Sequence, residues 1–481
     1  MHRIYCDSNI FRVLKPEHPS FNIELLNAFS DLKDILFFIF SDAHLDDLKN
    51  STDLEKTKKD LLLIGEYCKD NYLSYSLIGK EKNSLRAYLA TPLEAFENKD
   101  YEASKKAVAE ISGSDFLLNI FDGIPEMKEL APYLKAYLDL PIGVFTDDFA
   151  AKELDKQSKE QLNKFLPEYN PQMSLGNFIN KVIPYVFTLV NDKKEFTELR
   201  KCTSNYLNSN ELTYKKWGME FDSQLKKSAI GKTFSEILDT VIIGENKNDS
   251  HYTFTFAYSL LEVLGITNEG KKFNYDSLSR DADHAFYAAT CNFFVTDDKG
   301  LQVKAHILYN MIGVETKILS SKDFINRRSQ WLGNEESQSS FVSSFTHDRN
   351  HSFQVIDHTF IDTVINLKEF KTGHSYFNYF NRYQLTSQNS NSYYFYCKQS
   401  LVYNLYFYRE LELLTKKFLR AFGPDDDNKG IFKLEENSIL KDGVEIRSWT
   451  FNSMIITLLI SEKNTKANFV LEIKLVEPSS F

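Results

Sequence analysis

The chain has few cysteines, and none of them lies in a CxxC pair. The five are an odd number spread far apart along the sequence, at Cys6, Cys68, Cys202, Cys291 and Cys397. This spacing argues against a disulfide framework and against a structural zinc site. We therefore expect reduced thiols, most of them buried.

Long apolar runs and a basic excess are also missing. The longest apolar stretches, 35–40 and 454–460, fall far short of the roughly 20 residues that cross a membrane, and the N-terminus has no signal-peptide layout. The net charge of -10 argues against wrapping nucleic acid by overall charge, although a local basic groove is compatible with it. We expect a soluble, cytoplasmic protein that does not bind a membrane.

The 481 residues are enough for two or three domains. The uninterrupted apolar runs "RIYC" and "ILFFIF" suit parallel strands that are covered on both faces, and "FFVT" and "VETKILS" add later strands. The predicted fold class is α/β: a parallel sheet flanked by helices, formed by 1–50 and 271–328, is interrupted by a large helical insertion. A separate α+β domain is expected over 329–481.

The stretch 51–270 reads as mostly helical, with no alternating strand pattern. After a first helix near 51–71, further helices are predicted over 93–112, 126–139, 148–165, 173–190, 194–206 and 233–242. In the C-terminal domain we predict a helix over 399–422 that stops at Gly423 and Pro424, followed by a β-meander.

Aspartates recur at the ends of predicted strands or at the start of a predicted helix over 281–291. Asp7 follows the first strand, Asp47 lies in a helix after the second, Asp281 begins the later helix, and Asp298 follows "FFVT". Each has a structural interpretation as a helix cap, a dipole partner or a turn residue. Together they would place several carboxylates in one cleft, and such repulsion needs a cation. Oxygen ligands without His or Cys favour Mg²⁺ or Mn²⁺.

Four short motifs, "IYCDSNIF", "FSDAHLDDL", "DADHAFYA" and "FVTDDKGL", follow one another in this order. Together they resemble the acidic motifs of PIN-domain nucleases, which act mostly on single-stranded RNA and in some relatives on DNA. The resemblance covers about 1–50 and 275–325. It implies a metal-dependent endonuclease with a PIN-like sheet, in which four aspartates bind metal and act in catalysis and four neighbours assist: Asp7, Asp47, Asp281 and Asp298, with Ser8, Asn9, Thr296 and Asp297.

The chain departs from that family in three ways. A long segment separates the second and third motifs, Asp47 stands where glutamate is commoner, and a large C-terminal domain is appended. A toxin or defence role would follow only by analogy. The rival hypothesis is a non-catalytic adaptor or oligomerisation protein that keeps a PIN-like fold.

The expected partner is nucleic acid, with single-stranded RNA favoured. A basic cluster in the insertion is the candidate contact to the nucleic-acid backbone, and its alternative is a solvated helix face: Lys215, Lys216, Lys226, Lys227 and Lys232. The dense aromatic residues between 376 and 408 are compatible with base stacking but more typical of packing. The C-terminal domain is the expected site for a protein partner or for homo-oligomerisation.

Overall fold

The computed structural model describes most of the chain in separate ranges: 1–49, 51–76, 84–99, 174, 194, 221–227, 231–242, 248–264, 275–351, 353–360, 365–386, 389–397, 404–439, 443–451, 453–460 and 469–476. It forms two compact units, the first made of 1–96, 284–302 and 308–481, and the second of 97–283 and 303–307. The helices predicted between 126 and 206, and Lys215 and Lys216, lie outside the described residues apart from the isolated positions 174 and 194.

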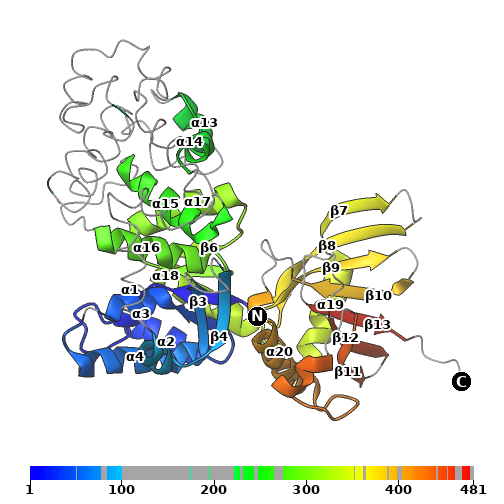
Figure 1. Ribbon diagram of the computed structural model, residues 1–481. Helices are drawn as coiled ribbons and strands as arrows, with labels where there is room; N and C mark the ends of the chain where they lie inside the picture. The colour runs from blue at the N-terminus through cyan, green and yellow to red at the C-terminus, as the bar shows by residue number, and fades with distance from the viewer. Residues whose placement is uncertain are drawn as a thin grey trace, which may run out of the picture. The chain divides into compact units, whose positions relative to one another are not determined.

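The first unit contains a six-stranded sheet with the order β4-β3-β2-β1-β5-β6 (Figure 1). Neighbouring strands from β3 to β6 run parallel, and only the edge strand β4 is antiparallel. The strand bounds are β1 Arg3–Cys6, β2 Phe37–Ser41, β3 Asn71–Ser76, β4 Ser84–Leu89, β5 Phe293–Val295 and β6 Lys317–Leu319. The prediction of an α/β fold with a largely parallel sheet is confirmed.

The expectation that 51–270 contains no strand is wrong, because β3 and β4 both lie there. Strand β3 alternates buried and half-buried residues, with Asn71, Leu73 and Tyr75 turned inward. This period of two is the expected strand pattern, but only one of the three inward residues is aliphatic, which weakens the signal. The predicted sheet therefore gains two strands on the β2 side.

Helices cover the face of this sheet that carries Ile4, Phe38 and Phe293. These side chains share one core with Phe29 and Trp331, which come from α2 and α18. The helices of this layer are α1 Ser8–Arg12, α2 Ile23–Leu32, α3 Asp42–Leu48, α4 Leu54–Cys68, α5 Pro92–Asn98 and α18 Ser321–Gly333. Because β1 and β2 are buried along their whole length, their sequences show no alternation.

Helices make up the described part of the second unit. They are α13 Phe221–Lys227, α14 Phe234–Val241 and α15 Ser250–Val263, together with parts of α16 Tyr275–Ala288 and α17 Lys299–Ile312, which continue into the first unit. Helices α13 and α14 lie side by side (Figure 1) and join through the rings of Phe221 and Phe234, whose centroids are 5.7 Å apart. In the described ranges no helix is long and apolar enough to cross a membrane.

A second sheet, antiparallel throughout, follows α19 Gln338–His351. Its order is β11-β12-β13-β10-β9-β8-β7, with β7 Phe353–Phe360, β8 Ile365–Tyr376, β9 Phe380–Thr386, β10 Asn389–Tyr396, β11 Glu445–Phe451, β12 Met454–Ile460 and β13 Phe469–Leu475. The predicted meander is present, whereas β7 to β10 were not predicted. The rings of Tyr376, Tyr383 and Phe395 are buried in its core, so this aromatic density serves packing.

Helix α20 Phe407–Phe422 stops where the sequence predicts. The next residue, Gly423, has a φ of +86°, which glycine adopts without steric cost, and Pro424 follows. The described helix begins at 407 rather than 399, after a short 3-10 turn at Asn404–Tyr406. The aromatic ring of Tyr406 packs edge-on against Phe37 at 5.3 Å, so the start of α20 is tied to the first sheet.

Candidate active site

Three predicted site residues follow the carboxyl ends of neighbouring parallel strands. Strand β1 pairs with β5 so that Cys6 lies opposite Val295, and the next residues, Asp7 and Thr296, meet just beyond the sheet. The Thr296 hydroxyl donates to Oδ2 of Asp7 and accepts the backbone N–H of Asp298 at 3.1 Å. Thr296 therefore bridges two of the predicted metal-binding positions, at the edge where open α/β sheets bind ligands.

Both of these aspartates also cap helices, as predicted for Asp7, whereas the structural interpretation of Asp298 was a turn residue. Oδ1 of Asp7 accepts the N–H of Ile10 at 3.0 Å at the start of α1, and Oδ1 of Asp298 accepts the N–H of Leu301 at 2.8 Å at the start of α17. Asp7 is buried and Asp298 is exposed. Capping fixes one oxygen of each carboxylate, so the two side chains keep fixed orientations at the sheet edge.

Asp47 faces the same region from α3, after β2. Its Oδ2 lies 3.0 Å from Nε2 of His284, which comes from α16. Its neighbour Asp46 instead pairs with Lys49 at 3.4 Å. This distinction agrees with the helical spacing, which lets only one of two adjacent aspartates face inward.

A hydrogen-bonded chain runs from Asp47 into the protein. Nδ1 of His284 lies 2.8 Å from the hydroxyl of Tyr5, which lies 2.6 Å from Oγ of Ser41. Because Nε2 faces a carboxylate, it carries a proton, while Nδ1 is held by the Tyr5 hydroxyl, which can either donate to it or accept from it. Tyr5, Ser41 and His284 are buried, so the chain holds the imidazole, and through it the Asp47 carboxylate, in one orientation.

The carboxylates of the buried Asp7 and the half-buried Asp47 differ in their proton affinity. Burial raises the pKa of Asp7, and the Thr296 hydrogen bond and the His284 charge oppose this only in part. At Asp47 burial acts in the same direction, but hydrogen bonds and charge from His284 outweigh it, so the pKa of Asp47 lies below its usual range. Asp47 is thus an ionised carboxylate at neutral pH, while Asp7 would gain most from a nearby cation.

His44 is a second buried histidine beside this chain. Its Nε2 donates to the Cys6 carbonyl at 2.8 Å, and its Nδ1 accepts the backbone N–H of Ser41 at 3.1 Å, which closes the capping box of α3. Burial, together with the charge of His284, lowers the pKa of His44 to about 3. The ring is therefore neutral in the folded protein.

The neutral His44 predicts a specific loss of stability in acid. Between about pH 6.5, where an unfolded histidine titrates, and about pH 3, the unfolded chain binds a proton that the native ring does not. Stability from this group is therefore full above pH 6.5 and falls as the pH falls, by about 1.4 kcal/mol per pH unit. In urea unfolding, we expect His44→Gln to have a lower free energy of unfolding than wild type, and this difference should become smaller between pH 6 and pH 4. A difference that stays constant with pH would contradict the assignment of a neutral His44 in the folded protein.

Ser8, Asn9 and Asp297, the predicted supporting residues other than Thr296, each contact another side chain or a backbone group. Ser8 is buried, with Oγ 3.4 Å from Nε2 of His284, and Asn9 is exposed and accepts from Arg12 at 3.0 Å. The exposed Asp297 accepts the backbone N–H of Ser321 at 2.8 Å, which ties the loop after β5 to the start of α18.

Asp281 is not at the start of its helix. Helix α16 is already formed at Tyr275 and ends at Ala288, so the predicted range 281–291 is wrong at both ends. The earlier turns continue the buried side of the helix through Leu278 and Ala282, which extends the apolar pattern toward the N-terminus. Asp281 lies in the second unit, three residues before His284 on the same helix.

The basic residues predicted to contact nucleic acid are described only in part. Lys226 and Lys227 are exposed in the last turn of α13, and Nζ of Lys226 lies 3.6 Å from Glu236. A pairing of this kind is typical of a solvated helix face.

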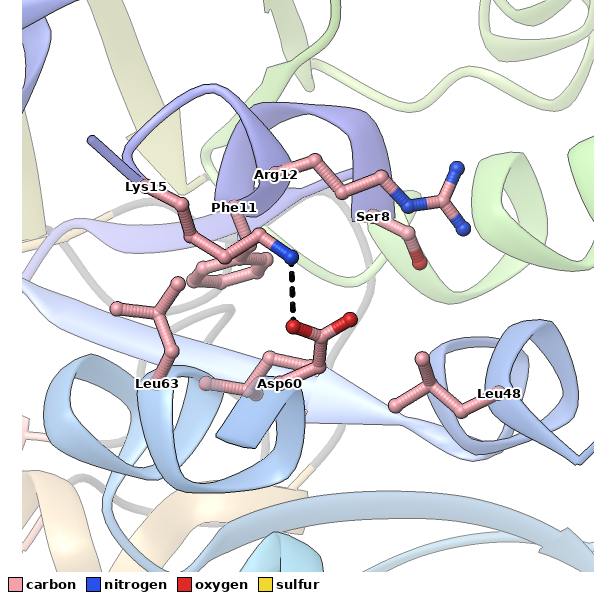
Figure 2. A pocket seen from close by; sticks show the side chains of 8 residues that line it. Ser8, Phe11, Arg12, Lys15, Leu48, Asp60 and Leu63 are labelled. Carbon is pink, nitrogen blue, oxygen red and sulfur yellow. Dashed lines mark hydrogen bonds and ion pairs between the residues drawn. The ribbon is translucent and has the colours of Figure 1, made fainter. Parts of the chain in front are cut away.

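A small hollow beside Ser8 is lined by two basic residues that the prediction did not include, Arg12 at the end of α1 and Lys15 in the turn that follows. Figure 2 shows the side chain of Arg12 extending beyond Ser8, while Lys15 pairs with Asp60 at 2.6 Å. The hollow has a volume of only about 10 Å³, which is the size of one water. The charge of Arg12 reaches Asp47 and helps to lower its pKa.

Sequence reasoning missed the two histidines and Tyr5 as parts of one site. His284 contacts Asp47, 237 positions earlier in the chain, and no spacing in the sequence indicates that contact. His44 had a detectable signal, because it stands at the third position after Ser41, where a capping box places its second side chain.

The carboxylate oxygens near this sheet edge belong to the ligand class that hard cations prefer. Across the ranges that the structure describes, no three His, Cys, Asp or Glu side chains are arranged to hold a metal ion. Mg²⁺ commonly uses only one or two carboxylates and completes its shell with water and substrate phosphate oxygens. Within the same ranges Oδ2 of Asp298 makes no hydrogen bond, so this exposed oxygen fits such a role. No protein-family model, curated protein or solved structure matches the chain.

Proposed function

We propose that this protein is a metal-dependent nuclease that hydrolyses phosphodiester bonds in single-stranded nucleic acid, with RNA the preferred substrate. The observation that carries the proposal is the bridge between Asp7 and Asp298 through Thr296, at the carboxyl ends of adjacent parallel strands. A capped and buried carboxylate beside an exposed one suits the binding of a cation that also contacts substrate. The motif resemblance to PIN-domain nucleases points to the same chemistry.

The residues fit Mg²⁺ or Mn²⁺. Asp7 and Asp298 would hold the cation, with Asp47 acting directly or through water, and Asp281 stays a sequence prediction for this role. When bound, the cation supplies positive charge to the phosphate and a water of lowered pKa as the nucleophile. The raised pKa of Asp7 fits this assignment, because a cation next to that carboxylate would offset the cost of burying its charge.

The protein's own groups have separate tasks in this proposal. Asp47 stays ionised and is therefore suited to be a ligand rather than a proton donor. His284 is a positioning residue, because it holds the Asp47 carboxylate and is itself held by the Tyr5 hydroxyl. Thr296 orients Asp7 through its hydroxyl. The side chain of Arg12 extends past Ser8, which is on the same helix (Figure 2), and would contact a backbone phosphate of the substrate.

The function is tested by cleavage of a short RNA with a fluorophore and a quencher at its ends. We expect cleavage of single-stranded RNA with Mn²⁺ and with Mg²⁺, slower cleavage of single-stranded DNA, and none when EDTA replaces the metal. Double-stranded RNA of the same sequence is the matched substrate control. An RNA trace that does not depend on the metal, or equal rates with and without protein, would contradict the proposal.

A further inference from the structure

A second hollow lies at the opposite edge of the first sheet, at the amino ends of β1, β5 and β6. Its volume is about 420 Å³, within the range of about 300–1,000 Å³ that small-molecule sites occupy. Arg3, Phe293 and Lys317, which begin these three strands, line one side, and Lys371 and Asn381 from β8 and β9 of the second sheet line another. The carboxylates Asp7 and Asp298 lie beyond the carboxyl ends of the same strands, so the two sites are separate.

The hollow gathers positive charge that the protein does not neutralise. In the described part of the chain, Lys317, Arg327 and Lys371 make no ion pair, and Arg327 instead lies over the ring of Phe293 at 5.6 Å. Burial lowers the pKa of Lys317, and the charges of Arg327 and Lys371 lower it further, so Lys317 is repelled by both of the other cations. Glu315 opposes this shift only as the smallest cause. Three cations that line one hollow favour the binding of an anion there.

Two of the residues that line the hollow have a polar atom that is not satisfied within the described ranges. Nη2 of Arg3 and Oδ1 of Asn381 are buried, and neither makes a hydrogen bond to any residue that the structure describes. Arg3 is only 5% exposed, and its other nitrogens are used, Nε by Glu410 at 2.7 Å and Nη1 by the Thr290 carbonyl at 3.3 Å. A buried polar atom without a partner costs free energy unless a ligand or water satisfies it. Nη2 of Arg3 needs a hydrogen-bond acceptor, and Oδ1 of Asn381 needs a hydrogen-bond donor.

We propose that this hollow, which we call the amino-edge pocket, binds a phosphorylated small molecule of nucleotide size. The phosphate would lie among Lys317, Arg327 and Lys371, and an acceptor oxygen of the ligand would meet the Arg3 guanidinium. The partner of Asn381 must be a donor, which a fully ionised inorganic phosphate lacks and which a sugar hydroxyl or a base amino group provides. The volume exceeds the needs of one phosphate group and suits an organic phosphate.

The proposal is independent of nuclease activity. The pocket contains no carboxylate of the candidate active site, and its cations can bind a phosphate without a divalent metal. We therefore expect the organic phosphate to bind in a buffer that contains EDTA. We also expect Asp7→Asn to leave this binding unchanged, so a failure of the nuclease proposal and a failure of this one give different results.

The test is isothermal titration calorimetry of the full chain in EDTA with three probes: ADP, ribose 5-phosphate and inorganic pyrophosphate. We expect at least one organic phosphate to bind more tightly than pyrophosphate. The double variant Lys317→Gln, Lys371→Gln should weaken that binding at least tenfold. Both lysines are exposed, so the fold should be retained, and equal melting temperatures would check this. Lys433→Gln, an exposed lysine outside the pocket, is the matched control and should bind like wild type.

Three outcomes would overturn the assignment. The first is the absence of saturable binding by all three probes at millimolar concentration, and the second is binding that the double variant does not weaken. The third is that a short single-stranded RNA competes with the probes and binds far more tightly than any of them. The amino-edge pocket would then be a nucleic-acid subsite.

Discussion

Asp7→Asn is expected to abolish metal-dependent RNA cleavage without unfolding the protein. Asparagine keeps the shape and one carbonyl oxygen, which can still accept the N–H of Ile10 and cap α1. It removes the negative charge that would hold the cation, and the loss of one such electrostatic group costs roughly 10²- to 10³-fold in rate. The measurement is the initial rate of fluorescent RNA cleavage with Mn²⁺ under single-turnover conditions.

Asp7→Asn should lower the activity of the protein but not its thermal stability. Because burial raises the pKa of Asp7, its ionised form is disfavoured in the folded protein, and the neutral amide avoids that cost at neutral pH. Without metal, we expect the variant to melt at the same temperature as wild type or higher. Adding Mn²⁺ should raise the melting temperature of wild type only, because the variant has lost a ligand.

Asp46→Asn is the matched control for this experiment. Asp46 lies next to Asp47 in α3 but pairs with Lys49 rather than with His284. Its charge change is the same as in Asp7→Asn, so an effect of net charge alone would appear in both variants. We expect the control to stay within threefold of the wild-type rate. Identical traces for wild type and Asp7→Asn would instead support the non-catalytic adaptor hypothesis.

The parts of the fold that sequence reasoning found are those with strong local signals. Strands β1, β2 and β5 are continuous apolar runs, and Gly423 with Pro424 marks the end of α20. Strand β3 was missed because two of its three inward residues are Asn71 and Tyr75, and Nδ2 of Asn71 donates to the Phe38 carbonyl at 3.0 Å, 33 positions away. A pattern that depends on such a partner cannot be seen locally.

The same limit applies to the candidate site. The positions of Asp7 and Asp298 at strand ends follow from strand order, and parallel pairing of β1 with β5 brings them to Thr296. The contact of Asp47 with His284 depends instead on how α16 crosses that edge, which no spacing in the sequence specifies. Motifs therefore predicted that Asp7 and Asp298 lie at one edge of the sheet, but not that a histidine would pair with Asp47.

The second large effect concerns a buried ion pair in the second unit. Nζ of Lys304 lies 2.9 Å from Oε2 of Glu262 and 4.6 Å from the centre of the Tyr258 ring, and the side chains of both charged residues are fully buried. Lys304→Met would remove the ammonium group that lies against the Glu262 carboxylate in a site that water does not reach. We expect a loss of about 3 to 5 kcal/mol in the free energy of unfolding of this unit, measured by urea titration.

A double variant separates the pair from the packing. Lys304→Met combined with Glu262→Leu removes both charges and keeps similar volumes, so it should regain most of the stability that the single change loses. The exposed pair of Lys226 with Glu236 in the same unit is the comparison, and Lys226→Met should cost at most about 1 kcal/mol. Equal losses in the single and double variants would mean that Lys304 stabilises the unit through its aliphatic chain and its contact with Tyr258, rather than through its charge.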